Sequence, residues 1–236
     1  MRILSFVFVL FFAIGISAQS AAAVSSFNEG MKAAASGEFE KALTSYRTAR
    51  VLANGEGRQS ELSAKLHFNI GVCLYRTGRA AESIAEFEES IRIRKGNYQK
   101  ALYALGMAEA ARENWVRAGR AFEAAIKLKK DDGEAWFDLA MVYLAQSDFD
   151  KAETAFRNSI AYRSTDSALS HNNIGVILAM KSDFSLAEKE FETALSLSAG
   201  RLVLAKSNLE YCRARNPREL LAKLVFSGNI RNVNHE

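Results

Sequence analysis

The residue types that most often do chemistry in proteins are sparse in this sequence. Its strongest candidate metal ligands and nucleophiles are His67, His171, His235, Cys73 and Cys212. They form neither a Cys-x-x-Cys nor a His-Glu-x-x-His motif, and the chain has no phosphate-binding glycine loop and no nucleophile elbow. We therefore expect no enzyme activity, no cofactor and no metal site.

A repeated pattern of apolar and small residues organises most of the chain. Trp136, Leu139 and Tyr143 fall on one face of an expected helix, and Ala152 and Phe156 on one face of a second helix after a polar turn. The same order recurs at steps of 34 or 35 residues, with one step of 41, which gives five copies. Each copy has a small residue four positions before an aromatic one: Ala42 and Tyr46, Ser83 and Phe87, Ala118 and Phe122, Ala152 and Phe156, Ala187 and Phe191.

This arrangement resembles the tetratricopeptide repeat, a helix-turn-helix unit of 34 residues. The resemblance implies an all-α fold, an α-solenoid in which antiparallel hairpins stack as a right-handed superhelix with C-terminal capping helices. Because one wall of two closely crossing helices must lack a side chain, we expect position 8 to face the small residue at position 20, and the aromatic residue at position 24 to pack toward the next hairpin. Position 8 is occupied by Gly30, Gly71, Gly106, Ala140 and Gly175.

The repeat numbering sets the expected boundaries. Segment 53–59, where the longer step occurs, is expected to be a loop or a lengthened helix end. Residues 201–226 are expected to add a capping helix and a short amphipathic helix, and 227–236 a flexible tail. The five predicted repeats are 23–56, 64–97, 99–132, 133–166 and 168–201.

The N-terminus has the layout of a secretory signal peptide. Met1-Arg2 gives a positive start, Ile3 to Ile16 are almost all apolar, and small residues follow. The apolar run is shorter than the roughly 20 residues of a membrane-spanning helix. We expect residues 1–22 to be removed and the protein to be exported to the periplasm or another part of the cell envelope. An uncleaved N-terminal membrane anchor is the alternative.

The formal net charge of +4 arises at the C-terminal end. Residues 1–200 carry 24 basic and 24 acidic side chains, whereas 201–236 carry 7 and 3. This distribution argues against a nucleic-acid partner. Two interpretations remain for the basic end, a weak contact with an anionic membrane surface or acidic partner, and a solvated cap. Its basic residues include Arg213, Arg215, Arg218 and Lys223.

Two further groups of polar residues have structural interpretations. His67 and His171 both stand at position 4, where the fourth copy has Trp136, so a core role is expected. Glutamates of the second helices, such as Glu86 and Glu123, are expected to be solvated.

The first helices carry the candidate binding residues. In the family that the chain resembles, positions 2, 5, 6, 9, 12 and 13 line the concave groove. Position 5 is aromatic in four copies, position 9 is Met or Val, and position 6 is Asn or Asp in four. These side chains either pack neighbouring first helices together or offer an apolar strip and a partial amide ladder to a peptide. The candidate partner-binding residues are Phe68, Asn69, Tyr103, Met107, Phe137, Asp138, Met141 and Asn173.

The resemblance therefore implies a protein-interaction scaffold in the envelope, with an extended or helical protein segment in the groove. The carboxylate clamp of chaperone-tail receptors needs Lys at position 5 and Asn at position 9, where this chain has Phe68 and Val72. That ligand is therefore not expected. A carrier of an apolar small molecule or lipid is the alternative for the same lining. The partner's identity and the oligomeric state are not indicated by the sequence.

Overall fold

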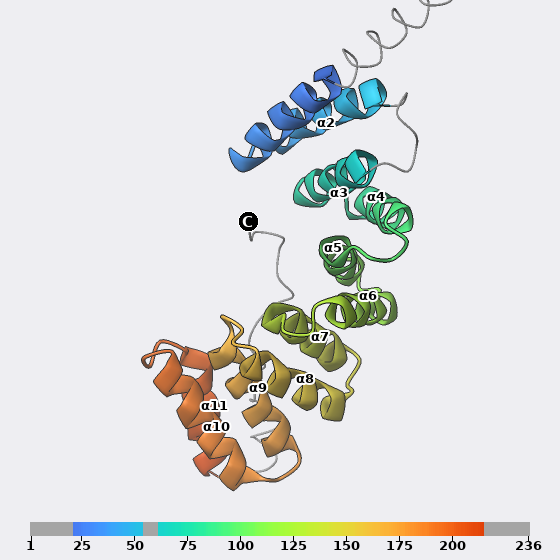
Figure 1. The fold of residues 1–236 in the computed structure, drawn as a ribbon. Coiled ribbons are helices and arrows are strands. Elements are labelled where there is room, and N and C mark those ends of the chain that lie inside the picture. The colour runs from blue at the N-terminus through green and yellow to red at the C-terminus, as the bar shows by residue number, and fades with distance from the viewer. Residues whose placement is uncertain (1–20, 54–60, 215–236) are drawn as a thin grey trace, which may run out of the picture. The chain divides into compact units, whose positions relative to one another are not determined.

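Every regular element in the described part of the chain is a helix. The computed structural model describes residues 21–53 and 61–214 (Figure 1), and these divide into two compact units at the bond between Arg112 and Glu113. The predicted signal segment up to residue 20, most of the 53–59 segment, the short helix after residue 214 and the tail lie outside the described residues. None of the described helices is long and apolar enough to cross a membrane.

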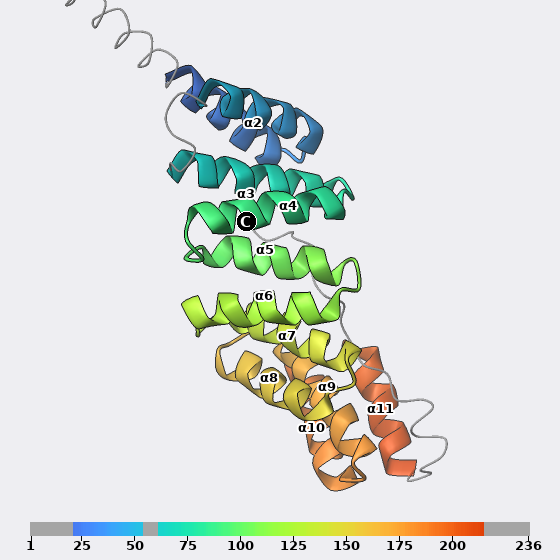
Figure 2. The ribbon, with the colours of Figure 1, turned by 90° about the vertical axis from the view of Figure 1, so that its right-hand side faces the viewer.

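The first unit is a series of helices that pack against their sequence neighbours (Figure 2). Its core contains Leu43, Tyr46 and Ile70 in one cluster and Ile84 and Phe87 in a second. The elements are a helix over residues 21–35, α2 (Phe39–Ala53), α3 (Glu61–Arg76), α4 (Ala80–Ile93) and α5 (Gln99–Ala110).

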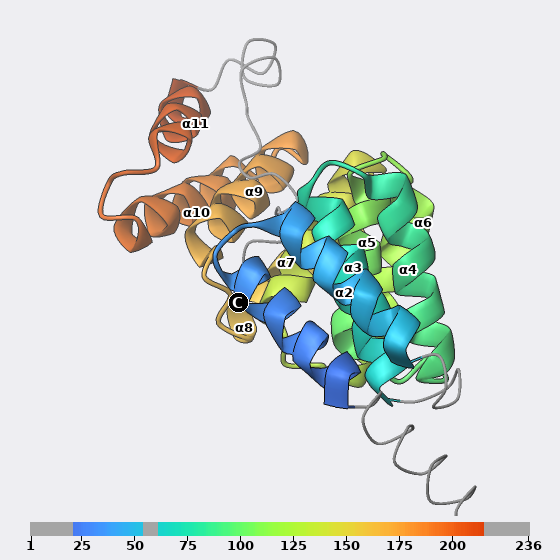
Figure 3. The same ribbon diagram turned by 90° about the horizontal axis from the view of Figure 1, so that it is seen from above.

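The second unit repeats this plan, with α7 and α8 forming one hairpin and α9 and α10 the next (Figure 3). Its core joins Phe137, Phe156, Ile174, Phe191 and Leu209. The last described helix, α11, packs against α10 and α9, which is the place predicted for the cap. The elements are α6 (Trp115–Leu128), α7 (Gly133–Ala145), α8 (Phe149–Ala161), α9 (Ser167–Met180), α10 (Phe184–Leu197) and α11 (Val203–Ala214). The predicted all-α fold of stacked hairpins is confirmed.

The turns inside the hairpins share one backbone device. Each has a residue with positive φ at repeat position 15, where the first helix must stop for the chain to reverse. Glycine, which has no Cβ to clash, serves in the first two copies, whereas later copies use other residues. In two of these, the aspartate that follows accepts a hydrogen bond from the next helix, so side-chain capping supports the turn. The positive-φ residues are Gly37, Gly78, Glu113, Ser147 and Ser182.

The glycine at position 8 makes room for the aromatic ring at position 24 of its own hairpin. A Cβ at Gly71 would lie 2.6 Å from Phe87 Cε1, and a Cβ at Gly175 would lie 2.6 Å from Phe191 Cε1. Gly30 has the same relation to Tyr46, at 2.7 Å. We expected the small residue at position 20 to face position 8 and the ring at position 24 to pack toward the next hairpin, whereas in these three hairpins the ring of the same hairpin lies nearest to the glycine.

This contact predicts opposite effects for two buried helix glycines of the second unit. Gly175→Ala should destabilise the protein by roughly 1–3 kcal/mol through overpacking against Phe191. A Cβ at Gly119 would meet Val142 Cγ1 at 3.5 Å, an ordinary contact. Gly119→Ala should therefore stabilise by about 0.5–1 kcal/mol, the helix-propensity difference. Denaturant unfolding measures both, and equal changes in the two variants would contradict the ring contact.

Candidate functional site

A line of polar side chains crosses the first helices of the second unit. Asp138 on α7, Asn173 on α9 and Asn208 on α11 all stand at repeat position 6. Their exposed fractions are 0%, 0% and 1%. Burying such groups costs free energy unless they are hydrogen-bonded, so their arrangement is a constraint on the unit. We call Asp138, Asn172, Asn173 and Asn208 the polar ladder.

Hydrogen bonds connect the ladder residues of α11 and α9, and a weak contact through Met141 reaches α7. Asn208 Nδ2 on α11 donates to Asn172 Oδ1 on α9 at 2.9 Å, and Asn172 Nδ2 donates to Asn173 Oδ1 at 3.2 Å. Asn173 Nδ2 donates to the Met141 sulfur on α7 at 3.7 Å, and this sulfur is a weak acceptor. The sequence predicted a partial amide ladder at position 6 that could pair with a peptide. In the structure, the amides of this unit are buried and pair with one another through Asn172 at position 5, and the pairing reaches α11.

The aromatic rings at position 5 pack within their own hairpins. The rings of Phe137 and Phe156 meet edge to face with centroids 5.6 Å apart. The Phe68 ring lies 6.1 Å from that of Phe87, and 5.4 Å from that of Tyr98 on the other side. These contacts favour a packing role for position 5, mostly against the second helix of the same hairpin rather than only against neighbouring first helices.

The predicted binding residues differ in how accessible they are, and they belong to two separate units. In the first unit, Phe68, Asn69 and Tyr103 are half-buried whereas Met107 is fully buried. In the second unit, Met141 is half-buried, and the three others are buried. The half-buried residues are therefore the ones that a partner could touch directly, and the buried ones support them. The buried members of the second unit are Phe137, Asp138 and Asn173.

The two histidines at position 4 pair with glutamates. His67 Nδ1 lies 2.6 Å from Glu86 Oε2, and Arg50 Nη1 donates to Glu86 Oε1 at 2.9 Å. His171 and Glu190 repeat the pair at 2.6 Å. Burial raises the pKa of the Glu86 carboxyl, but hydrogen bonds and charges from His67 and Arg50 outweigh it and hold the pKa below its usual range.

The His–Glu pairs show how buried Glu86 is and which groups its carboxylate contacts. Glu86 is half-buried and ion-paired, so the expectation that it is solvated was wrong. Among the described residues, no group of three or more His, Cys, Asp or Glu side chains is placed to hold a metal ion. Cys73 and Cys212 are free and buried, and burial raises the pKa of Cys73 to about 11. The Cys73 thiol is therefore protonated near neutral pH.

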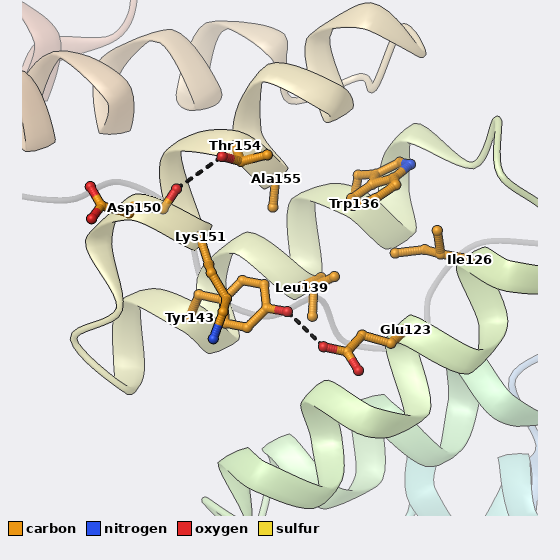
Figure 4. A pocket seen from close by; sticks show the side chains of 9 residues that line it. All are labelled: Glu123, Ile126, Trp136, Leu139, Tyr143, Asp150, Lys151, Thr154 and Ala155. Carbon is orange, nitrogen blue, oxygen red and sulfur yellow. Dashed lines mark hydrogen bonds between the residues drawn. The ribbon is translucent and has the colours of Figure 1, made fainter.

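A pocket of about 390 Å³ opens between α6, α7 and α8 (Figure 4). Its apolar lining comes from Ile126, Trp136, Leu139 and Ala155. Tyr143 forms part of the wall, and its hydroxyl donates to Glu123 Oε1 at 2.6 Å. Burial, and next this hydrogen bond, raise the pKa of Tyr143. The remaining lining residues are Glu123, Asp150, Lys151 and Thr154. We call this the outer pocket.

The outer pocket is a site that the sequence reasoning missed. Trp136 and Tyr143 were assigned to packing because they fall on the apolar stripe of their helix. The residue at position 23 could have revealed the pocket in the sequence. Position 23 is Glu86 or Glu190 in the copies that have His67 or His171 at position 4, but it is Ala155 in the copy that has Trp136. The small Ala155 side chain leaves space beside the Trp136 ring, whereas in the other two hairpins the longer glutamate fills this space by pairing with the histidine.

Comparisons with known proteins agree with this architecture. A family model described as tetratricopeptide repeat matches residues 27–98, 103–157 and 137–201. The BBSome complex member BBS4 homolog of Drosophila melanogaster is 26% identical over 114 residues, which are 48% of this chain and only 23% of that protein's length. Two solved structures share the fold. YrrB, a TPR protein described as having an unusual peptide-binding site, aligns with TM-score 0.66 and 22% identity over 83% of this chain and 95% of its own. MamA 41-end from Desulfovibrio magneticus RS-1 aligns with TM-score 0.66 and 18% identity over 77% and 97%.

The ladder predicts that one of its amides is structurally important. Asn172→Ala removes a hydrogen-bond partner from both Asn208 and Asn173, and should destabilise the protein by about 1–3 kcal/mol. The control is Asn158→Ala on α8, a half-buried position where Ala improves helix propensity. Thermal unfolding of the two variants measures the difference. Equal stability of Asn172→Ala and Asn158→Ala would show that the ladder contributes nothing.

Proposed function

Since the chain belongs to the tetratricopeptide repeat family, we propose that it is a protein-interaction module whose first helices bind a segment of a partner protein. The class of function is supported by the family and by the absence of a recognised catalytic motif in the sequence. YrrB, a protein of the same fold, is described as having a peptide-binding site.

The observation that carries the proposal is the polar ladder. A helix face that served only as core would place apolar residues at these positions, because buried amides need hydrogen bonds to offset their desolvation. Side-chain amides offer a donor and an acceptor, as a peptide backbone does. Hydrogen bonds join Asn208 on α11 to Asn172 and Asn173 on α9, and Asn173 also contacts the Met141 sulfur on α7. The buried ladder fixes the first helices of the second unit, so a protein segment that lies across them would touch the half-buried residues that the ladder supports.

The half-buried residues beside these positions supply the side-chain contacts. Met141 adjoins the ladder through Asn173, and its flexible thioether suits varied partner side chains. In the first unit, Asn69 stands at the equivalent of the ladder position, with Phe68 and Tyr103 half-buried at position 5. Each unit therefore has half-buried residues at or beside position 6, and the proposal can be tested in each unit separately.

Photocrosslinking in cells that express the chain natively tests the proposal. Benzoylphenylalanine at Asn69 or Met141 should give a discrete adduct of defined mass, whereas the same group at Leu197, 56% exposed on α10, should not. Adding Tyr103→Ala to the Asn69 probe should lower the adduct yield about tenfold or more if Tyr103 is a binding hot spot. Circular dichroism checks that the helices persist. Equal adducts from Leu197 and the first-helix positions would contradict the proposal.

A further inference from the structure

We infer that the outer pocket is a second binding site, which accepts a large apolar side chain that neighbours a basic residue on a partner protein. It is formed by different residues from the polar ladder. The inference goes beyond the proposed function and does not depend on it, since either site can fail its test while the other passes. Its support comes from the position, size, lining and charge of the pocket.

The outer pocket and the ladder lie on opposite sides of α7. At 3.6 residues per turn, each residue advances about 100° around a helix. Trp136, Leu139 and Tyr143 therefore fall within one narrow sector, and Asp138 and Met141 point to the far side. The two sites share a helix but no lining residue. A partner in one site leaves the other accessible.

The base of the pocket is apolar and already buried. Leu139, Ile126 and Ala155 are 2%, 6% and 1% exposed. Because they are held by the packing around them, they form a surface that exists before a ligand binds. The Trp136 indole N–H donates to the Lys130 carbonyl oxygen at 2.9 Å, which fixes the ring as a wall. A volume of about 390 Å³ lies within the range of small-ligand pockets, and it can hold one large side chain.

The charges at the mouth select the occupant. Lys151 Nζ is committed to Asp148 at 2.7 Å, and Asp150 accepts from Lys181 at 2.7 Å. Glu123 accepts a hydrogen bond from the Tyr143 hydroxyl and is not a partner in the ion pairs of Lys151 and Lys181. The Lys151 ammonium also lies over the Tyr143 ring, 5.4 Å from its centroid. A basic group beside the apolar side chain therefore complements Glu123, and an acidic one would be repelled by it.

The size and the charge together point to a peptide segment. A large apolar side chain would bury its surface against Leu139 and Trp136, while the neighbouring Lys or Arg would remain at the rim beside Glu123. Because the rim is exposed to solvent, the ion pair should add specificity more than affinity. The apolar contact should therefore dominate binding, and the charge should discriminate among partners.

A dipeptide titration of the full chain tests the site. The probe is N-acetyl-phenylalanyl-arginine amide, and the readout is the indole N–H resonance of Trp136, assigned by comparison with a Trp115→Phe variant. We expect a saturable shift with millimolar affinity, because the probe fills only one pocket. N-acetyl-phenylalanyl-glutamate amide should bind more weakly. Absence of a saturable shift below about 10 mM, or equal binding of the two dipeptides, would overturn the inference.

Two matched variants distinguish the pocket from other surfaces. Thr154 and Thr193 are both exposed on second helices, and each donates its hydroxyl to the carbonyl four residues earlier. Thr154→Phe at the mouth should weaken probe binding at least tenfold, whereas Thr193→Phe should leave it unchanged. Glu123→Gln keeps an acceptor for Tyr143 but loses the charge, and should weaken the arginine probe about 2–5-fold. Undiminished binding to Thr154→Phe would show that the probe sits elsewhere.

Discussion

The packing of an aromatic ring directly against a glycine backbone is the interaction on which the hairpins depend. In three hairpins the ring at position 24 occupies the volume that a side chain at position 8 would need. The two helices can therefore approach, and the ring becomes fully or almost fully buried between them. Because this contact lies inside the hairpin, the remaining faces of the first helix are free to serve other purposes. The fourth hairpin has Ala140 at position 8, and there Phe156 is also buried and meets Phe137 edge to face.

The two candidate sites follow from how the remaining positions are filled. At position 5, Phe137 packs against the ring of Phe156. At position 6, buried polar side chains form the ladder of α7, α9 and α11. Positions 4 and 23 meet on the other side, where a His–Glu pair closes the space in two hairpins. In the hairpin of α7 and α8, Trp136 faces Ala155 instead, and the space remains open as the outer pocket. One repeat scaffold therefore carries two different kinds of surface.

Much of this architecture could be predicted from the sequence, because helical hairpins depend on periodic patterns that a single chain displays. The period near 34 residues and the small and aromatic residues of each second helix predicted the hairpins. What the pattern did not contain was which facing residue comes nearest. Gly71 was expected to meet a small residue but meets Phe87, because the approach depends on how the helices cross. Glu86 looked solvated because its partners, His67 and Arg50, lie on two other helices. The outer pocket was missed for a similar reason, since the empty space beside Ala155 exists only where α6, α7 and α8 pack together.

A double-mutant cycle on Gly175 and Phe191 tests the ring contact most directly, with unfolding free energies measured for Gly175→Ala, Phe191→Leu and the double variant. If the added methyl group destabilises the protein through a steric clash with the ring, Gly175→Ala should lower the unfolding free energy less once Phe191 has been replaced by the smaller Leu. The two substitutions should then be coupled by about 1 kcal/mol or more, within the range for residues in direct contact. Additive effects within about 0.3–0.5 kcal/mol would show that the glycine and the ring do not constrain each other, and would contradict the account.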